Sequence, residues 1–242
     1  MERTEIKETM KKIKDNFFVK STFILGLVAF LSALALSHIK KITYPNILKQ
    51  AEEKKRKALS LVLPGYKIVK EKNFKMNNRS FSFWEGKKNF NGAKTKGYAY
   101  VTSKSGYSGE IESMIGFDEQ GKILGIYILQ QSETPGLGAR CLEVANDDLF
   151  WLSLFRKSKK KSSFKTPWFQ EQYQGLNLNE KISILQKGDW KPSLKNELFS
   201  NNAITAITGA TITSKAVTES LQKTFAFLKK EFNLVIPKED SE

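Results

Sequence analysis

The amino-acid sequence predicts an α+β domain, with a twisted antiparallel sheet and packed helices, joined to one N-terminal transmembrane helix. Three observations lead to this fold class. An apolar run without charged side chains lies at residues 21–39, short strand-like segments fill residues 81–129, and an amphipathic helical pattern covers residues 213–232. We therefore divide the chain into an N-terminal flank (1–20), a transmembrane anchor (21–39), a helical stalk (40–64), a folded domain (65–235) and a tail (236–242).

The predicted anchor, Ser21–Ile39, contains no Asp, Glu, Lys or Arg. As a helix it would span roughly 28 Å, close to the hydrocarbon thickness of a bilayer. A cleaved signal peptide is the alternative, because Ala33-Leu34-Ala35 has the small-x-small pattern that signal peptidases prefer. We favour an uncleaved anchor, because about twenty residues of charged chain precede the apolar run. Basic residues are about equally frequent on both sides of the run, so charge does not decide the orientation in the membrane.

The elements after the anchor are predicted from residue spacing. Apolar residues at helical spacing indicate a helix from Asn46 to about Leu61, which Pro64-Gly65 ends. β-Branched and aromatic residues indicate four strands, at residues 81–84, 97–102, 111–117 and 122–129. The turn Glu119–Gly121 joins the last two strands into a hairpin.

The C-terminal part is predicted to be irregular at first and then helical. The stretch Phe150–Ser200 is rich in Lys and Ser and includes one short predicted helix, Pro167–Gln174. From Thr213 to about Phe232, apolar residues recur at helical spacing with Lys and Glu opposite, which predicts a helix packed on the sheet. Its core-facing stripe consists of Val217, Leu221, Thr224, Leu228 and Phe232.

The composition excludes several classes of function. A single Cys rules out an internal disulfide, a four-Cys zinc site and an iron–sulfur cluster held by this chain alone, and a single His rules out a multi-His metal site. We expect Cys141 to be partly buried and structural. The net charge of +15 comes from 35 Lys and 5 Arg that are scattered along the chain. This pattern favours solvated faces and attraction to anionic lipid, and no nucleic-acid partner.

The first motif with chemical content is Ser132-Glu133-Thr134-Pro135-Gly136-Leu137-Gly138-Ala139, which follows a predicted strand. Two glycines after a proline allow the backbone to approach a ligand closely. Taken alone, the same pattern is also typical of a structural turn.

The second motif is Ile207-Thr208-Gly209-Ala210-Thr211-Ile212-Thr213-Ser214, directly before the C-terminal helix. Free backbone N–H groups and the positive end of the helix dipole make such a helix start a natural phosphate site. The alternative is an N-cap made by Thr213 or Ser214. That alternative leaves the upstream Thr-Gly-Ala-Thr unexplained.

Together, the segments Glu133–Gly138 and Thr208–Thr211 resemble the FMN-binding domain of the G subunit of Rnf-type ion-translocating oxidoreductases. The C subunit of the sodium-translocating NADH:quinone reductase shares this domain. The resemblance extends through Gly97-Tyr98, Gly106–Ile111 and Gly121–Ile123, and it covers most of Tyr66–Leu228. It implies that residues 65–235 form an FMN-binding domain.

The resemblance also implies a site. The FMN phosphate would be esterified to Thr211, in a phosphate pocket shaped by Thr208, Gly209, Ala210 and Thr213. The loop near the flavin ring would contain Glu133, Thr134, Gly136, Leu137 and Gly138. The family usually has an Asp three residues before the first Thr of the second motif, where this chain has Thr205. That Asp is part of what the modifying transferase recognises.

We expect a separate flavin transferase to attach the cofactor. A Thr hydroxyl needs an adjacent base to act as a nucleophile, and no His, Asp or Glu stands beside Thr211 in the sequence. A phosphodiester at this position carries one negative charge, which the start of a helix stabilises.

The resemblance implies a membrane-anchored flavoprotein subunit that relays electrons through FMN in a complex coupling electron transfer to ion translocation. Such a subunit has no independent active site, and its partners are the other subunits, the flavin transferase and the lipid bilayer. It would lie in the inner (cytoplasmic) membrane with the domain on the extracytoplasmic side. The first alternative is a stand-alone, membrane-tethered FMN-binding redox or sensor domain. The second is a basic surface protein that binds anionic lipid or nucleic acid.

Overall fold

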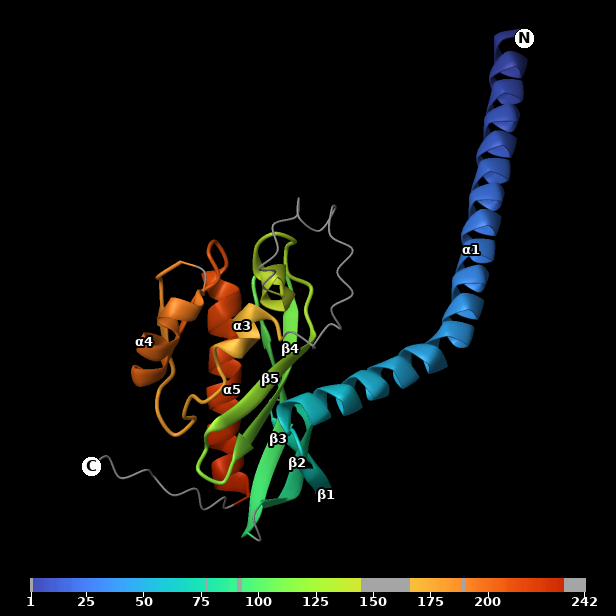
Figure 1. Cartoon of the computed structure of the whole chain (residues 1–242). Coiled ribbons are helices and arrows are strands. Elements are labelled where there is room, and N and C mark those ends of the chain that lie inside the picture. Colours follow the sequence, from blue (N-terminus) through green and yellow to red (C-terminus); the bar gives the residue numbers. More distant parts are fainter. Residues whose placement is uncertain (1, 77, 91–92, 145–165, 189, 233–242) are drawn as a thin grey trace, which may run out of the picture. The chain divides into compact units, whose positions relative to one another are not determined.

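The computed structural model describes residues 2–76, 78–90, 93–144, 166–188 and 190–232 (Figure 1). Contacts divide the chain into two compact units, Met1–Glu53 and Lys54–Glu242. The second unit contains all of the strands that the structure describes.

The N-terminal unit is part of one long helix, α1 (Glu2–Val62), which contains Pro45. Among the described residues, its segment Asn16–Val62 is the one helical stretch long and apolar enough to cross a membrane, with a mean hydropathy of 2.1 in its most apolar window. Large apolar side chains in this segment, such as Phe23 and Leu25, are exposed, which suits lipid better than water. The helix runs through the predicted ends of the flank and the anchor without a break, so the domain boundaries stay predictions.

Five antiparallel strands form the main sheet, in the same order along the sheet as along the chain. They are β1 (Lys67–Met76), β2 (Arg79–Phe90), β3 (Ala93–Ser105), β4 (Glu110–Asp118) and β5 (Ile123–Gln130). The four predicted strands lie within or overlap β2 to β5, and β4 and β5 form the predicted hairpin, with Gly121 in the turn at φ +84°. The strand β1 was not predicted. Nearly all of its side chains are exposed, so it lacks the alternation of apolar and polar residues that marks a half-buried strand.

A smaller sheet pairs β6 (Ser183–Leu185) with β7 (Ala203–Thr205) in parallel. The 3₁₀ helix η2 (Pro192–Leu194) and the helix α4 (Lys195–Ser200) lie between these two strands in the chain. The prediction contained antiparallel strands alone, and strands of three residues are too short to leave a pattern in the sequence. The helix α3 (Trp168–Glu171) falls within the predicted helix at residues 167–174, whereas residues 150–165 lie outside the described residues.

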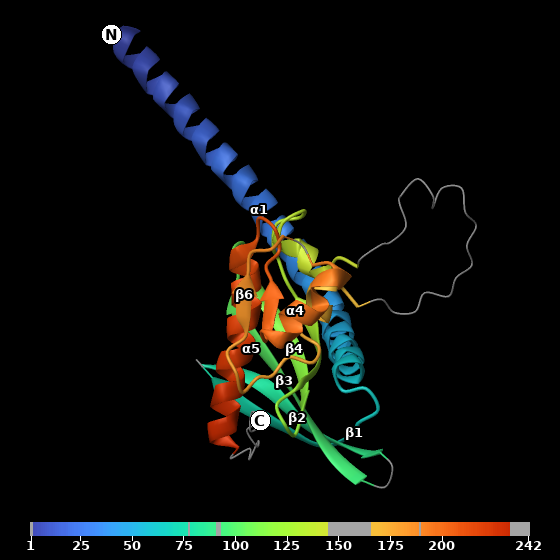
Figure 2. The same ribbon diagram turned by 60° about the vertical axis from the view of Figure 1, so that its left-hand side comes forward.

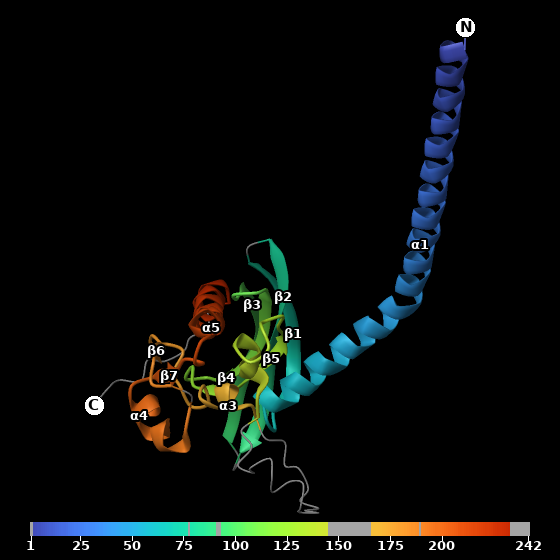
Figure 3. The same cartoon turned by 90° about the horizontal axis from the view of Figure 1, so that it is seen from above.

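The C-terminal helix α5 (Thr211–Glu231) packs on β3 and β4, between the main sheet and the region of β6, β7 and α4 (Figures 2 and 3). The predicted stripe is confirmed, because Val217, Leu221 and Leu228 are buried. Buried hydrogen bonds fix the helix to β3. The Tyr100 hydroxyl donates to the Leu221 carbonyl oxygen at 2.6 Å.

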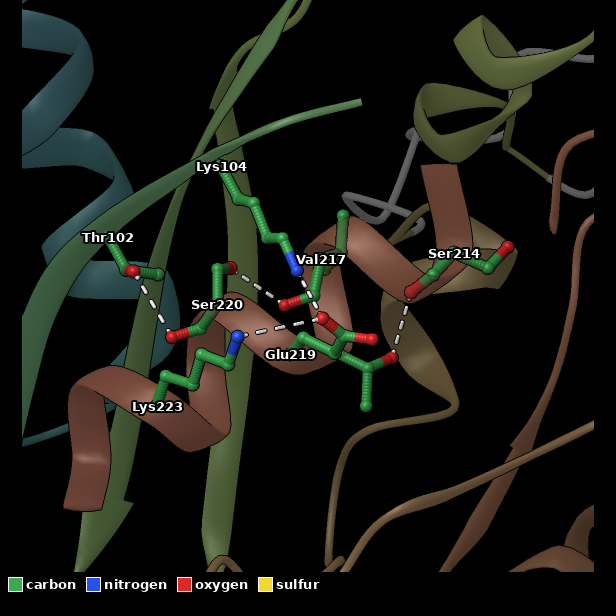
Figure 4. A network of polar contacts seen from close by, with 8 residues as sticks. Thr102, Lys104, Ser214, Val217, Glu219, Ser220 and Lys223 are labelled. Atoms are coloured by element: carbon green, nitrogen blue, oxygen red, sulfur yellow. Dashed lines mark hydrogen bonds and ion pairs between the residues drawn. The ribbon is translucent and has the colours of Figure 1, made fainter. Parts of the chain in front are cut away.

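Polar side chains also join α5 to β3, and Figure 4 shows Thr102 and Lys104 beside Glu219 and Ser220. The Thr102 hydroxyl donates to the Ser220 carbonyl oxygen at 3.2 Å, and Lys104 forms an ion pair with Glu219. These contacts join the middle of α5, at residues 219–221, to β3 and so fix the position of the helix on the sheet. The last four residues of the second motif, Thr211–Ser214, form the first turn of this helix.

The two faces of the main sheet have different covers. Phe117 of β4 contacts Phe225 of α5, with ring centroids 5.3 Å apart. On the opposite face, the last turn of α1 lies against Gly116, where an added Cβ atom would overlap with the backbone carbonyl of Val62. Successive residues of a strand point to opposite faces. The alternation Phe117–Gly116 therefore places α5 and the end of α1 on opposite sides of the sheet.

Candidate cofactor site

The two sequence motifs meet in the folded domain. Between them lies a cavity of about 450 Å³, which we call the motif cavity. It lies at the start of α5, beside the loop after β5 and the Gly106–Gly109 loop. It is lined by Tyr107, Glu133, Thr134, Leu137, Gly138, Gly209, Ala210, Thr211, Ile212 and Thr213. All of the predicted site residues except Thr208 and Gly136 are therefore in its wall.

The start of α5 has no side-chain cap. Its N-cap residue is Ala210, so the alternative interpretation of Thr213 or Ser214 as the N-cap is wrong. Ser214 is buried and holds the preceding loop, because its hydroxyl accepts from the Ile207 N–H at 3.0 Å and donates to the Ala210 carbonyl oxygen at 3.2 Å. The first N–H groups of an α-helix have no partner inside the helix. Here they begin at Thr211, in the cavity wall.

The hydroxyl groups of the cavity differ in how they are bonded. The Thr213 hydroxyl is buried and donates to Glu133, and the Thr134 hydroxyl lies 2.9 Å from that of Ser108. The half-buried Thr211 hydroxyl forms no hydrogen bond within the part of the chain that the structure describes. Among the threonines of the cavity wall, Thr211 is thus the one whose hydroxyl is available to a ligand.

Glu133 links three parts of the site. Its Oε1 atom accepts the backbone N–H groups of Ser108 at 3.0 Å and Gly109 at 3.4 Å, and its Oε2 atom accepts the hydroxyl of Thr213. Burial raises the pKa of Glu133, but the hydrogen bonds from Thr213 and from the 107–109 backbone together outweigh it. Its pKa therefore lies below the ordinary value, and the carboxyl group is ionised at neutral pH.

Two glycines, Gly138 and Gly209, allow the walls of the cavity to pack closely against each other. Gly138 lies against the Glu133 and Thr213 side chains, and an added Cβ atom there would overlap with the Glu133 carboxylate. Gly209 has φ +76°, a left-handed conformation that favours glycine, and it faces the side chain of Leu137. The first motif thus touches the second one directly.

The family model for the FMN-binding domain matches residues 106–226, which is half of the chain. The chain belongs to the FMN-binding domain family. This match includes both motifs and the Gly106–Gly109 loop, and it confirms the resemblance and the fold class that the sequence predicted.

This FMN-binding protein is similar to named subunits of membrane complexes. It is 29 % identical over 231 residues to the G subunit of the Na(+)-translocating ferredoxin:NAD(+) oxidoreductase complex of Acetobacterium woodii, covering 88 % of this chain and 94 % of that protein. It is 25 % identical over 232 residues to the G subunit of the ion-translocating oxidoreductase complex of Buchnera aphidicola, covering 91 % and 96 %. A solved structure of the C subunit of the Na(+)-translocating NADH-quinone reductase from Parabacteroides distasonis has a TM-score of 0.48 at 16 % identity, covering 80 % of this chain and 97 % of that one.

The residues of the motif cavity fit an FMN group. Its volume lies within the range of about 300–1,000 Å³ that small-molecule sites occupy. The uncapped start of α5 offers N–H donors for a phosphate, and the Thr211 hydroxyl lies at the same place. Leu137 and Ile212 offer apolar surface for a ring, since they are 44 % and 52 % exposed.

Two predicted residues lie apart from the cavity wall. Gly136 has φ +76° and no neighbour near its Cβ position, so it serves the turn in which the Leu137 N–H donates to the Thr134 carbonyl oxygen at 3.1 Å. Thr208 is exposed and is not part of the lining. Conversely, Tyr107 and Ile212 line the cavity but were not nominated. Ile212 could have been found from the sequence, because it is an apolar residue that does not belong to the core-facing stripe of α5.

The position at which this FMN-binding chain departs from the family pattern is inside the protein. Thr205 is fully buried in β7, and its hydroxyl donates to the Gly188 carbonyl oxygen at 2.6 Å. Its backbone N–H donates to the Gln172 side chain at 2.8 Å. It does not line the motif cavity.

Proposed function

We propose that this chain is the FMN-carrying G subunit of a membrane complex that couples electron transfer to ion translocation, and that the motif cavity holds its FMN. The observation that carries the proposal is the junction of the two motifs, where an unbonded Thr211 hydroxyl, an uncapped helix start and apolar side chains surround one cavity. Relatives that match nearly the whole chain are named as the G subunit of such complexes. Bound FMN would supply the electron chemistry, and the protein supplies its position and electrostatic surroundings.

We further propose that FMN is attached through a phosphoester to the Thr211 Oγ1 atom. The hydrogen bonding of the cavity supports this position, because the Thr213 and Thr134 hydroxyls already have partners. Gly209, Ala210 and Thr213 would surround the phosphate, and the loop from Glu133 to Gly138 would lie near the ring. Thr208 would at most contribute a hydrogen bond from outside the cavity wall.

The charges of the cavity favour a covalent link over simple binding. Within the part of the chain that the structure describes, no Lys or Arg lines the cavity, although the chain has a net charge of +15. Free FMN has a phosphate with up to two negative charges, and this cavity offers it backbone N–H groups and one carboxylate. A phosphodiester has only one negative charge. Once FMN is tethered, its contact with the cavity is intramolecular, so the protein no longer needs a high affinity for free FMN.

The remaining partners follow from the same assignment. The apolar part of α1 would anchor the chain in the lipid bilayer of the inner (cytoplasmic) membrane. The FMN domain would face the extracytoplasmic side, next to the other subunits of the complex. A separate flavin transferase would form the phosphoester. Glu133 does not replace it as a base, since its carboxylate is bonded to Thr213.

The test is production of the full chain with a flavin transferase, followed by intact mass and in-gel flavin fluorescence after denaturation. The unmutated chain and T208A should carry one FMN, and T211A should carry none. Fluorescence that survives in T211A but is lost in T208A would move the attachment to Thr208. An unmutated chain that purifies without any flavin would overturn the FMN assignment itself.

A further inference from the structure

Among the described residues that line the motif cavity, Glu133 is the one with a charged side chain. It is 6 % exposed, whereas most carboxylates of the chain lie at the surface. A buried carboxylate normally has a cationic partner or a full set of hydrogen bonds. Glu133 has only the second, because no Lys or Arg forms an ion pair with it or lowers its pKa within the described part of the chain.

The hydrogen bonds hold the carboxylate in place without cancelling its charge. The donors are the Ser108 and Gly109 N–H groups and the Thr213 hydroxyl, all of them neutral. The Gly138 backbone lies directly against one side of the carboxylate, since a Cβ atom added there would overlap with it. The site therefore holds a fixed negative charge beside the place where the second motif begins α5.

We propose that Glu133 supplies an uncompensated negative charge to the cofactor cavity and thereby disfavours any further negative charge there. The inference rests on the proposed function, since it concerns the cofactor assigned to this cavity. It predicts two effects. The doubly charged phosphate of free FMN binds poorly without the tether, and a bound flavin is harder to reduce, because the reduced ring loses a proton readily and is then anionic.

The physical basis is the low polarisability of a partly buried site. Two charges there interact through an effective dielectric constant nearer to about 20 than to the 80 of water. Removing one of them therefore changes the affinity for an anion measurably. We expect about a tenfold change in affinity, which corresponds to about 1.4 kcal/mol.

The first experiment uses the full chain in detergent with T211A, so that no tether forms. Binding of FMN and of riboflavin, which lacks the phosphate, is measured by flavin fluorescence. E133Q keeps the size of the side chain and an oxygen that accepts the Ser108 N–H. It should raise the ratio of FMN affinity to riboflavin affinity about tenfold. A purely structural role for Glu133 predicts that both affinities fall together.

The second experiment measures the midpoint potential of the tethered flavin by dithionite titration of the full chain. E133Q should shift the potential upward. The matched control is E219Q, which removes a carboxylate of α5 that is paired with Lys104 at the surface, and it should leave the potential unchanged. T213V removes a hydrogen bond of Glu133 but not its charge, so it should not raise the potential.

The outcomes separate the inference from the proposed function. Flavin that binds to the unmutated chain, with an unchanged affinity ratio and potential in E133Q, overturns the inference and leaves the FMN assignment intact. An unmutated chain that binds no flavin overturns the assignment. If E133Q does not fold, T134K replaces it, because it adds a countercharge at an exposed position of the same cavity. T134K should raise the ratio of FMN affinity to riboflavin affinity relative to T134Q. If it does not, the inference is overturned as well.

Discussion

Substitution of Gly138 by Ala should distort the motif cavity without removing any of its polar groups. A Cβ atom at this position would overlap with the Glu133 carboxylate and lie 2.5 Å from the Thr213 hydroxyl oxygen. Gly138 is not among the glycines with a left-handed backbone, so the cost of G138A is steric. Overpacking costs about 1–3 kcal/mol, and a lost hydrogen bond to a charged group costs about 1.5–3 kcal/mol. With both costs, we expect the free energy of unfolding to fall by about 2.5–6 kcal/mol.

The assay is urea unfolding of the full chain in detergent, followed by tryptophan fluorescence, with covalent flavin content measured in parallel. G136A is the matched control in the same loop. Its cost is backbone strain at φ +76°, about 1–2 kcal/mol, because nothing lies near the added methyl group. G136A should retain flavin, and G138A should lose most of it. Equal urea midpoints for G138A and the unmutated chain, with full flavin loading, would refute the packing argument.

Three further predictions concern other parts of the chain. T205V removes the buried hydroxyl that donates to the Gly188 carbonyl oxygen, so the free energy of unfolding should fall by about 1–2 kcal/mol, and an unchanged urea midpoint would contradict this. Burial, with a smaller contribution from Glu133, raises the pKa of Cys141 to about 12, so its thiol is protonated at pH 8 and should react with a thiol reagent only in denaturant. Labelling of the native protein would refute that burial, and C141S should keep its flavin content. Removal of residues 1–39 should give a protein that stays in solution after a high-salt wash, and a truncated protein that still pellets with membranes would reveal a second anchoring element.

Elements with a regular apolar pattern were predictable from the sequence, and elements without one were not. The helix α5 buries one face, which produces a period in the sequence. The strands β2 to β5 contain buried β-branched and aromatic residues, which marked them as strands. The strand β1 pairs with β2, and Phe74 is its one buried side chain, so it has no periodic apolar face. Backbone pairing leaves no trace in residue types. The strands β6 and β7 have three residues each, which is too short for a period, although all three residues of β7 are buried.

The candidate site was predictable as two motifs but not as one set of contacts. Glu133 and Thr213 are eighty positions apart, and their hydrogen bond depends on how α5 lies on the sheet. The resemblance placed Glu133 near the flavin ring, and only the fold shows that its carboxylate bonds to the first turn of the helix that begins at Thr211. The N-cap interpretation was wrong for a related reason. The Thr213 hydroxyl bonds to Glu133 and the Ser214 hydroxyl to the preceding loop, and the N-cap residue is an alanine.

The buried position of Thr205 changes the meaning of the departure from the family pattern. Its hydroxyl and its N–H bond to Gly188 and to Gln172, so it shapes the strand that leads into the second motif. A carboxylate at the same place in this chain would face the Gly188 and Leu185 carbonyl oxygens, which repel negative charge. Threonine is therefore the residue that this interior accepts, and the cavity around Thr211 forms without an aspartate.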